Sequence, residues 1–346
     1  MKELPEINTS FGDLYRTLHE PIRTKLLLTG IELGIFNQLS EPNEFEAVSE
    51  AIDTHPGNTR RFMDGLAVCD LVTKKNGRYQ NTEIAQEFLV KGSPVYLGDF
   101  LVYAYQWSVP AFENMTALVR DGPPPAPEID AASEDVWVAG ARVTANYQRA
   151  GMGQFVAKII SGLPEFPTLK RMLDLGGGPG VIGMAIVGAH PDMKGVVFDQ
   201  PAVVRVAESV IREQEMEDRM TVLGGNYMQD PIGEGYDLVW ASATLNFAKQ
   251  DIDLVVKKIY DALNPGGVFV SLSDGLTHEG TKPRDMTLGM VSTALMGLDM
   301  GLNQGFIAES MLRCGFSSVR SQTVDVIMGP WELDIGRKVQ IPEDRR

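Results

Sequence analysis

The residues with the clearest chemical meaning form a glycine-rich segment at 172–183, Met-Leu-Asp-Leu-Gly-Gly-Gly-Pro-Gly-Val-Ile-Gly. An apolar, strand-like run enters a glycine turn, and a helical pattern follows. Glycine lets the backbone approach a ligand closely, and a helix N-terminus supplies N–H donors and the positive end of a dipole. The segment therefore predicts a binding site for a nucleotide-like cofactor.

Two cofactors are compatible with this turn. The pattern Gly-x-Gly-x-x-Gly at 178–183 satisfies the dinucleotide fingerprint, and Asp199 lies at the distance expected of a carboxylate that holds ribose hydroxyls. S-adenosylmethionine has no pyrophosphate, but its sulfonium and ammonium groups favour a nearby carboxylate. Asp174, placed before Gly176-x-Gly178, supplies one. We therefore favour S-adenosylmethionine over a nicotinamide dinucleotide.

Polar residues follow the next two expected strands. Asp199 and Gln200 are placed to bind the ribose, and Asn226 and Tyr227 are placed to face the adenine. The run Leu-Asn-Pro-Gly-Gly at 263–267, before the fifth strand, is also typical of proteins that bind S-adenosylmethionine.

The elements that must position these residues alternate between strands and helices from Met172 onward. This alternation predicts an α/β fold, with a doubly wound, mainly parallel Rossmann-like sheet. The expected strands lie at 172–176, 195–199, 220–225, 236–242, 267–273 and, more weakly, 324–329.

The first 105 residues are mainly helical, with a short helix at 45–52 and a further helix that Asn58 or Thr59 could cap. Asn76-Gly77 between two short extended runs predicts a hairpin, because a type I′ turn needs positive φ at both central residues. Short helices followed by a hairpin indicate a winged-helix-like domain. We expect three segments: a dimerisation domain at 1–105, a helical linker and pocket segment at 106–165, with one helix from about 135 to 163, and a cofactor domain at 166–346.

Charge restricts the partners of this 346-residue chain. Its formal net charge of −15 argues against nucleic acid and anionic membranes as partners, so the winged-helix-like domain is expected to dimerise rather than read DNA. The N-terminal segment lacks an apolar signal core and no transmembrane run is visible, which predicts a cytoplasmic location. Cys69 and Cys314 stand far apart in the chain without a metal-ligand pattern, so no metal is expected.

In the order of its motifs, the chain resembles the S-adenosylmethionine-dependent small-molecule O-methyltransferases of the caffeate, hydroxyindole and polyketide type. The resemblance rests on the Asn-Gly hairpin and on the runs LDLGGGPG, VFDQP, GGNYM, DLVWAS, LNPGG and LRCGF. It implies a homodimer formed through the N-terminal domain and contacts of Gly176 and its neighbours with the methionine part of the cofactor. It also places Ser242 near the adenine or the carboxylate.

Family members carry a catalytic histidine shortly after the fourth strand, and this chain has Asn246 at that position. Asparagine cannot accept a proton at useful pH, so the family's base is missing. The loss indicates a nucleophile that needs no base, a different base, or chemistry other than methylation. His278 and Asp274, just beyond the fifth strand, are the candidate replacements, although each could be a plain turn residue.

Aromatic and methionine side chains suggest an apolar substrate pocket, although each could simply pack in the core. We expect methyl transfer to a small, largely apolar, cyclic acceptor, at oxygen and by positioning. The alternatives are N-, C- or S-methylation, or other chemistry on the same fold. The candidate pocket residues are Trp107, Tyr147, Met152, Met290 and Met296.

Overall fold

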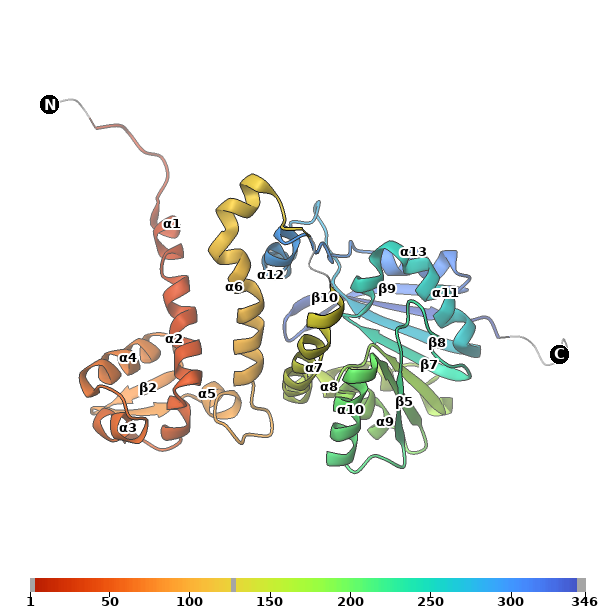
Figure 1. The fold of residues 1–346 in the computed structure, drawn as a ribbon, viewed down its shortest axis with the longest axis horizontal. Helices are drawn as coiled ribbons and strands as arrows, with labels where there is room; N and C mark the ends of the chain where they lie inside the picture. Colours follow the sequence, from red (N-terminus) through yellow and green to blue (C-terminus); the bar gives the residue numbers. More distant parts are fainter. Residues whose placement is uncertain (1–3, 126–128, 341–346) are drawn as a thin grey trace. The chain divides into compact units, whose positions relative to one another are not determined.

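The computed structural model of the chain describes residues 4–125 and 129–340. It divides into two compact units, one ending at Val102 and the other beginning at Tyr103 (Figure 1). The segment 106–165, expected as a separate linker, is part of the second unit. In the described part of the chain, every helix is too short or too polar to cross a bilayer.

The first unit consists of short helices and a three-stranded sheet. Its strand order is β1-β3-β2, and β2 pairs antiparallel with β3. Asn76 and Gly77, with φ of 52° and 81°, connect these two strands, which confirms the predicted hairpin. The helices are α1 Gly12–Thr17, α2 Glu20–Glu32, α3 Phe45–Ala51, α4 Pro56–Val68 and α5 Glu83–Phe88, with a 3-10 turn at Ile35–Gln38; the strands are β1 Asn43–Glu44, β2 Val72–Lys75 and β3 Arg78–Asn81.

The cap of α4 differs from the prediction. His55, not Asn58 or Thr59, is the N-cap, and its Nδ1 accepts a hydrogen bond from the backbone N–H of Asn58 at 3.2 Å. The reason is Pro56, whose fixed φ suits the first position of a helix.

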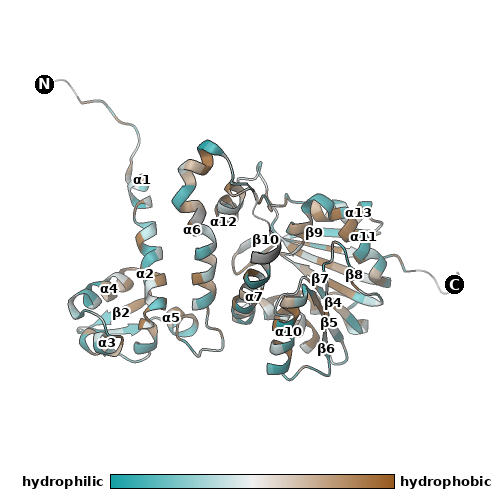
Figure 2. Ribbon diagram, in the orientation of Figure 1, coloured by the Kyte–Doolittle hydropathy of each residue, from teal (hydrophilic) through white to brown (hydrophobic). Residues whose placement is uncertain are grey.

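The second unit is built on a seven-stranded sheet of order β6-β5-β4-β7-β8-β10-β9. The first five strands in this order are parallel, and β10 joins β8 and β9 antiparallel. The central strands are largely apolar (Figure 2). The strands are β4 Arg171–Leu175, β5 Lys194–Asp199, β6 Met220–Gly224, β7 Tyr236–Ser242, β8 Leu263–Ser273, β9 Ser318–Val326 and β10 Gly329–Arg337.

Helices cover both faces of this sheet, which confirms the doubly wound α/β prediction (Figure 1). Met172 of β4 packs toward α8, α9 and α10, whereas its neighbour Leu173 packs toward α11 and α13, because successive strand residues point to opposite faces. The remaining helices of the chain are α6 Gly98–Asp121, which begins in the first unit, α7 Ile129–Tyr147, α8 Gly153–Ser161, α9 Val181–Gly188, α10 Pro201–Glu213, α11 Ile252–Ala262, α12 Arg284–Leu295 and α13 Phe306–Arg313, with 3-10 turns at Phe166–Thr168 and Leu245–Asp251.

Two predicted elements are corrected. The expected strand at 324–329 is in fact the end of β9, the turn at 327–328 and the start of β10. Most side chains of β9 are exposed, among them Ser318, Arg320 and Asp325, so it lacks the apolar run that marks a buried strand. The expected continuous helix at 135–163 is broken by a π turn at Gln148–Met152, where Gly151 has a φ of 117°.

Candidate functional site

The carboxyl ends of β4, β5, β6, β7 and β8 meet on one side of the sheet because these strands are parallel. In open α/β sheets ligands bind at this side, where the strand order reverses. The reversal falls at β4, which lies between β5 and β7. Every residue that the sequence assigned to the cofactor lies within or at the end of one of these strands, or just after it.

The turn after β4 has the strained backbone that requires glycine. Gly176, Gly178 and Gly180 have φ of 64°, 56° and 75°. A side chain on Gly176 would lie 2.6 Å from Cβ of Thr244, whereas one on Gly178 would meet no atom within 4 Å. The backbone at Gly178 therefore borders open space, and a ligand can approach it closely.

Asp174 lies under this turn rather than in it. The residue is 2% exposed, and Oδ2 of its carboxylate accepts a hydrogen bond from the N–H of Gly183 at 3.0 Å. Burial raises the pKa of Asp174 to about 7, and the nearby Asp199 acts in the same direction. The carboxylate thus ties the start of α9 to β4, and its expected contact with the sulfonium stays a prediction.

Asp199, at the end of β5, faces the turn. Its Oδ2 accepts from the N–H of Gly178 at 2.8 Å and its Oδ1 accepts from the N–H of Gln200 at 2.7 Å. Burial raises the pKa of Asp199. Each oxygen keeps a second acceptor position, so the carboxylate can still bind two hydroxyls of a ribose. Gln200 is exposed beside it.

The loop after β6 presents one exposed amide and one half-buried phenol. Oδ1 of Asn226 accepts from the N–H of Met228 at 2.9 Å, so its Nδ2 is the group left to donate. The hydroxyl of Tyr227 donates to the carbonyl of Thr244 at 2.8 Å, and burial raises its pKa. This hydrogen bond connects the loop after β6 to the loop after β7. Ser242, the last residue of β7, is half-buried.

Asn246 and Asp274 are in direct contact, 28 residues apart in the sequence. Nδ2 of Asn246 donates to Oδ1 of Asp274 at 2.5 Å and to the carbonyl of Met300 at 2.8 Å. Oδ2 of Asp274 accepts from the N–H of Leu302 at 2.6 Å. Burial raises the pKa of Asp274, although these hydrogen bonds oppose the shift. The sequence singled out both side chains but missed the Met300–Leu302 backbone, which no motif marks.

His278 is not part of this contact. It lies in an exposed turn with a φ of 52°, and its Nδ1 hydrogen-bonds with Oγ1 of Thr277 at 3.1 Å. The bridge between Thr277 and Lys282 closes the turn. This placement matches the simpler reading of His278 as a turn residue, and a role as base stays a prediction.

The expected substrate residues have different environments. Met152 is fully buried in the core cluster beside the sheet, and its role in binding the acceptor stays a prediction. Burial raises the pKa of Tyr147 to about 12. Trp107 is 45% exposed and lies edge-on to Tyr103, with their ring centroids 5.9 Å apart. Met290 and Met296 are half-buried on α12 and at its end.

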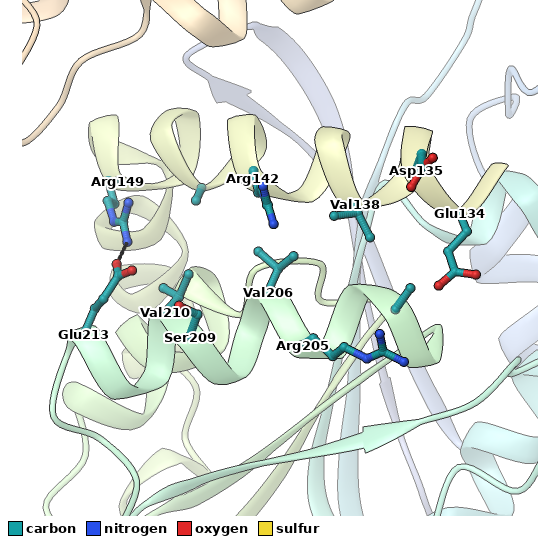
Figure 3. Close-up of a pocket in the computed structure, with 12 residues that line it drawn as sticks. Glu134, Asp135, Val138, Arg142, Arg149, Arg205, Val206, Ser209, Val210 and Glu213 are labelled. Carbon is teal, nitrogen blue, oxygen red and sulfur yellow. Dashed lines mark hydrogen bonds and ion pairs between the residues drawn. The ribbon is translucent and has the colours of Figure 1, made fainter. Parts of the chain in front are cut away.

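A cleft of about 500 Å³ lies between α7 and α10 (Figure 3). It is lined by charged side chains, including Arg142 and Arg205, and an ion pair of 3.3 Å joins Arg149 to Glu213 at one end. None of the residues predicted for the site lines it. The described residues contain no group of three His, Cys, Asp or Glu side chains arranged to hold a metal ion.

Comparison with known proteins identifies the class. Residues 142–302 match the family model of an O-methyltransferase domain, and residues 15–91 match that of an O-methyltransferase dimerisation domain. The N,N-dimethyltransferase OxyT of Streptomyces rimosus is 24% identical over 89% of this chain and 91% of its own length. The tetracenomycin polyketide synthesis 8-O-methyl transferase TcmO of Streptomyces glaucescens is 23% identical over 94% of this chain and 96% of its own length.

Solved structures agree on the fold. Human N-acetylserotonin methyltransferase in complex with S-adenosylmethionine aligns with a TM-score of 0.76 and 22% identity, over 96% of this chain and all of that one. The fold and the two domain models define a methyltransferase. The chain belongs to the S-adenosylmethionine-dependent O-methyltransferase family with an N-terminal dimerisation domain, as the sequence motifs indicated, and S-adenosylmethionine is its cofactor.

Proposed function

We propose that this enzyme methylates a small, largely apolar, cyclic acceptor at an oxygen atom, and that it does so by positioning the acceptor rather than by a histidine base. The observation that carries the proposal is the arrangement at the carboxyl ends of the strands. There the open space at Gly178, the free acceptor positions of Asp199 and the amide of Asn246 lie at or just beyond the carboxyl ends of three neighbouring strands, β4, β5 and β7.

The cofactor half of the site fits S-adenosylmethionine. Asp199 binds the ribose hydroxyls, with Gln200 beside it, and Asn226 and Tyr227 border the adenine. Ser242 lies near the adenine or the carboxylate. The turn from Gly176 to Gly178 takes the methionine part against bare backbone. When bound, S-adenosylmethionine supplies a methyl group on a cationic sulfur. The chain's own task is to hold the acceptor in line with that methyl.

Positioning can carry much of the rate. Holding two reactants in the right geometry is worth several orders of magnitude, whereas a general base adds roughly 10²–10⁴-fold. Asn246 has no proton-accepting group near neutral pH, and Asp274 is engaged by two donors. We therefore expect an acceptor whose oxygen is nucleophilic without a strong base, such as an acidic phenol or an enol.

N-methylation is a second candidate, favoured by the similarity to a relative named as an N,N-dimethyltransferase. A neutral amine is nucleophilic without losing a proton first, so it also fits a site without a histidine base. Relatives named as O-methyltransferases, such as TcmO, favour oxygen. The two targets are separated by the product formed from a hydroxy acceptor and from its amino analogue.

We expect a homodimer formed through the first unit. A row of large apolar side chains is exposed in and beside α1 and at the start of α2: Phe11 at 71%, Leu14 at 77%, Leu18 at 66% and Ile22 at 57%. An apolar groove lies beside it on α2 and α4, lined in part by Leu26 and Phe62. Exposed apolar patches of this kind mark interaction surfaces, and the dimerisation-domain match supports this one.

The dimer predicts that Leu14→Glu combined with Leu18→Glu yields a monomer in sedimentation at micromolar concentration. Leu312→Glu is the matched control, because Leu312 is an exposed leucine, at 58%, on α13 of the second unit. A double variant that sediments like the wild type would exclude the row as the dimer surface.

Methyl transfer is tested with cofactor labelled in its methyl group. The purified enzyme is incubated with a panel of hydroxy- and amino-substituted bicyclic aromatics, and the products are separated. Label in the ether product supports the proposal, and label only in the N-methyl product supports the second candidate. An acceptor that is consumed without gaining label would show chemistry other than methyl transfer.

A further inference from the structure

The loop after β6 contains a turn at 226–230 that is closed by its own hydrogen bonds. The carbonyl of Asn226 accepts from the N–H of Gln229 at 2.9 Å and from the N–H of Asp230 at 2.7 Å. Oδ2 of Asp230 accepts in return from the N–H of Asn226 at 2.8 Å. These bonds fix the shape of the turn. They do not fix its place beside the sheet, because each of them joins two residues of the turn itself.

Lys258 connects this turn to helix α11. Its Nζ donates to the carbonyl of Tyr227 at 2.6 Å and to the carbonyl of Asp230 at 2.8 Å. An ammonium group offers three hydrogens at one atom, and its positive charge strengthens each hydrogen bond that it donates. One side chain therefore holds two separate points of the turn.

The helix that carries Lys258 has a fixed position on the sheet. Val255, Val256 and Ile259 of α11 are fully buried in the core cluster on that face of the sheet, and Lys258 itself is half-buried. The backbone at Lys258 is thus a rigid support, and the two hydrogen bonds extend that support to the loop after β6.

The strand order indicates which part of the cofactor this loop meets. The glycine turn follows β4, Asp199 ends β5 and the loop follows β6, and these three strands are neighbours in that order. In S-adenosylmethionine the ribose lies between the methionine part and the adenine. With the methionine part at the glycine turn and the ribose at Asp199, the adenine falls at the loop after β6.

We propose that Lys258 is a positioning residue for the adenine end of the cofactor and acts through the carbonyls of Tyr227 and Asp230. Without these two hydrogen bonds the loop can move away from α11, and the adenine loses the surface that Asn226 offers it. This inference rests on the adenine contacts of the proposed function. The glycine turn has its own hydrogen bond to Asp199, so the loss of binding is confined to ligands that carry the base.

The test compares two ligands that differ in the base: S-adenosylhomocysteine, and S-ribosylhomocysteine, in which a hydroxyl replaces the adenine. Their affinities are measured by calorimetry in the wild type and in Lys258→Met, which keeps an unbranched apolar stem but cannot donate. We expect the variant to bind S-adenosylhomocysteine roughly 10-fold more weakly, the effect of about one hydrogen bond to a charged group. Its affinity for S-ribosylhomocysteine should change by about twofold or less, because this ligand has no base for the loop to meet.

Hydrogen exchange followed by mass spectrometry is a second readout, which needs no ligand. The amides of 226–230 should exchange faster in Lys258→Met, whereas those of α9, which begins at the glycine turn, should keep their wild-type rates. Lys258→Arg should restore the affinity for S-adenosylhomocysteine to within about threefold of the wild type, because a guanidinium has the same charge and several N–H donors.

The neighbouring lysine is the matched control. Lys257 lies on the same helix but forms an ion pair with Asp261, one turn further along α11. Lys257→Met removes the same charge from α11 and no hydrogen bond from the loop. Both affinities and the exchange of the loop should therefore stay at their wild-type values. If Lys258→Met does not fold, Lys258→Gln serves, because its amide is too short to reach both carbonyls.

The possible outcomes separate the inference from the proposed function. Wild-type affinity for S-adenosylhomocysteine in Lys258→Met or Lys258→Gln overturns the role of Lys258, and so does an equal loss of affinity for both ligands. If the wild type binds S-ribosylhomocysteine too weakly to measure, exchange decides, and an unchanged loop overturns the role. Equal binding of the two ligands by the wild type refutes the adenine contacts, and the inference fails with them. Methyl transfer is judged separately, by the labelled cofactor.

Discussion

The two glycines at the start and middle of the cofactor turn should respond differently to the same substitution. Gly176→Ala and Gly178→Ala each place a Cβ on a backbone with positive φ, which costs about 1–2 kcal/mol for a non-glycine residue. At Gly178 nothing else opposes the methyl group, since no atom lies within 4 Å. At Gly176 the new Cβ would lie 2.6 Å from Cβ of Thr244, so the loop after β7 must move.

We therefore expect Gly178→Ala to lower the free energy of unfolding by about 1–2 kcal/mol. Gly176→Ala should lower it by about 2–5 kcal/mol, because overpacking adds about 1–3 kcal/mol. For cofactor affinity the expected order of the two variants is the reverse, because the cofactor must occupy the open space at Gly178. Gly178→Ala should weaken S-adenosylhomocysteine binding roughly 10- to 100-fold while the protein stays folded, if a similar overpacking cost falls on the bound state.

Urea unfolding monitored by circular dichroism gives the stabilities, and calorimetry gives the affinities. Thr244→Gly in the Gly176→Ala background should recover part of the lost stability, because it removes the atoms that the new Cβ meets. Wild-type affinity in Gly178→Ala would refute the assignment of the open space to the cofactor. Equal destabilisation by the two alanines would refute the packing argument at Gly176.

Two further predictions concern buried carboxyls. Burial raises the pKa of Asp334 to about 7, so the folded state binds this proton more tightly than the unfolded chain, and stability should fall by up to about 4 kcal/mol as pH rises from about 4 to 7. Asp334→Asn should therefore unfold at a higher urea concentration than the wild type at pH 8, and a lower midpoint would contradict this. Asp174 also titrates at about 7, and a nearby sulfonium would favour its ionised form. The affinity for S-adenosylmethionine relative to S-adenosylhomocysteine should then rise between pH 6 and 8 in the wild type and stay flat in Asp174→Asn; a flat wild-type ratio would place Asp174 away from the sulfonium.

The parts of the fold that the sequence predicted well are those with local signals. The Asn76-Gly77 hairpin follows from two residues that tolerate positive φ, and the five parallel strands follow from short apolar runs before polar turns. The hairpin of β9 and β10 was missed because β9 is mostly polar and exposed, so its pairing depends on β10 rather than on its own pattern.

In the candidate site, too, features with a local sequence signal could be predicted and contacts between distant segments could not. Asp199 could be placed because it ends a strand next to the glycine turn. The contact between Asn246 and Asp274 could not, because it depends on how two loops 28 residues apart meet beyond the sheet. Met300 and Leu302 act through backbone atoms, which carry no residue-type signal. Met152, a candidate pocket residue, belongs to a buried core cluster, and an apolar residue type alone does not distinguish a pocket wall from the core.

The polar exposed strand β9 also affects how copies of this protein can meet. As the terminal strand of its sheet it carries backbone groups open to strand addition, which is a common route to aggregation. Arg320 and Asp325 place charges along it, and an incoming strand would have to strip water from them. Protection of this edge disfavours growth of the sheet by strand addition at β9, and so favours contacts between copies that form by side-chain packing.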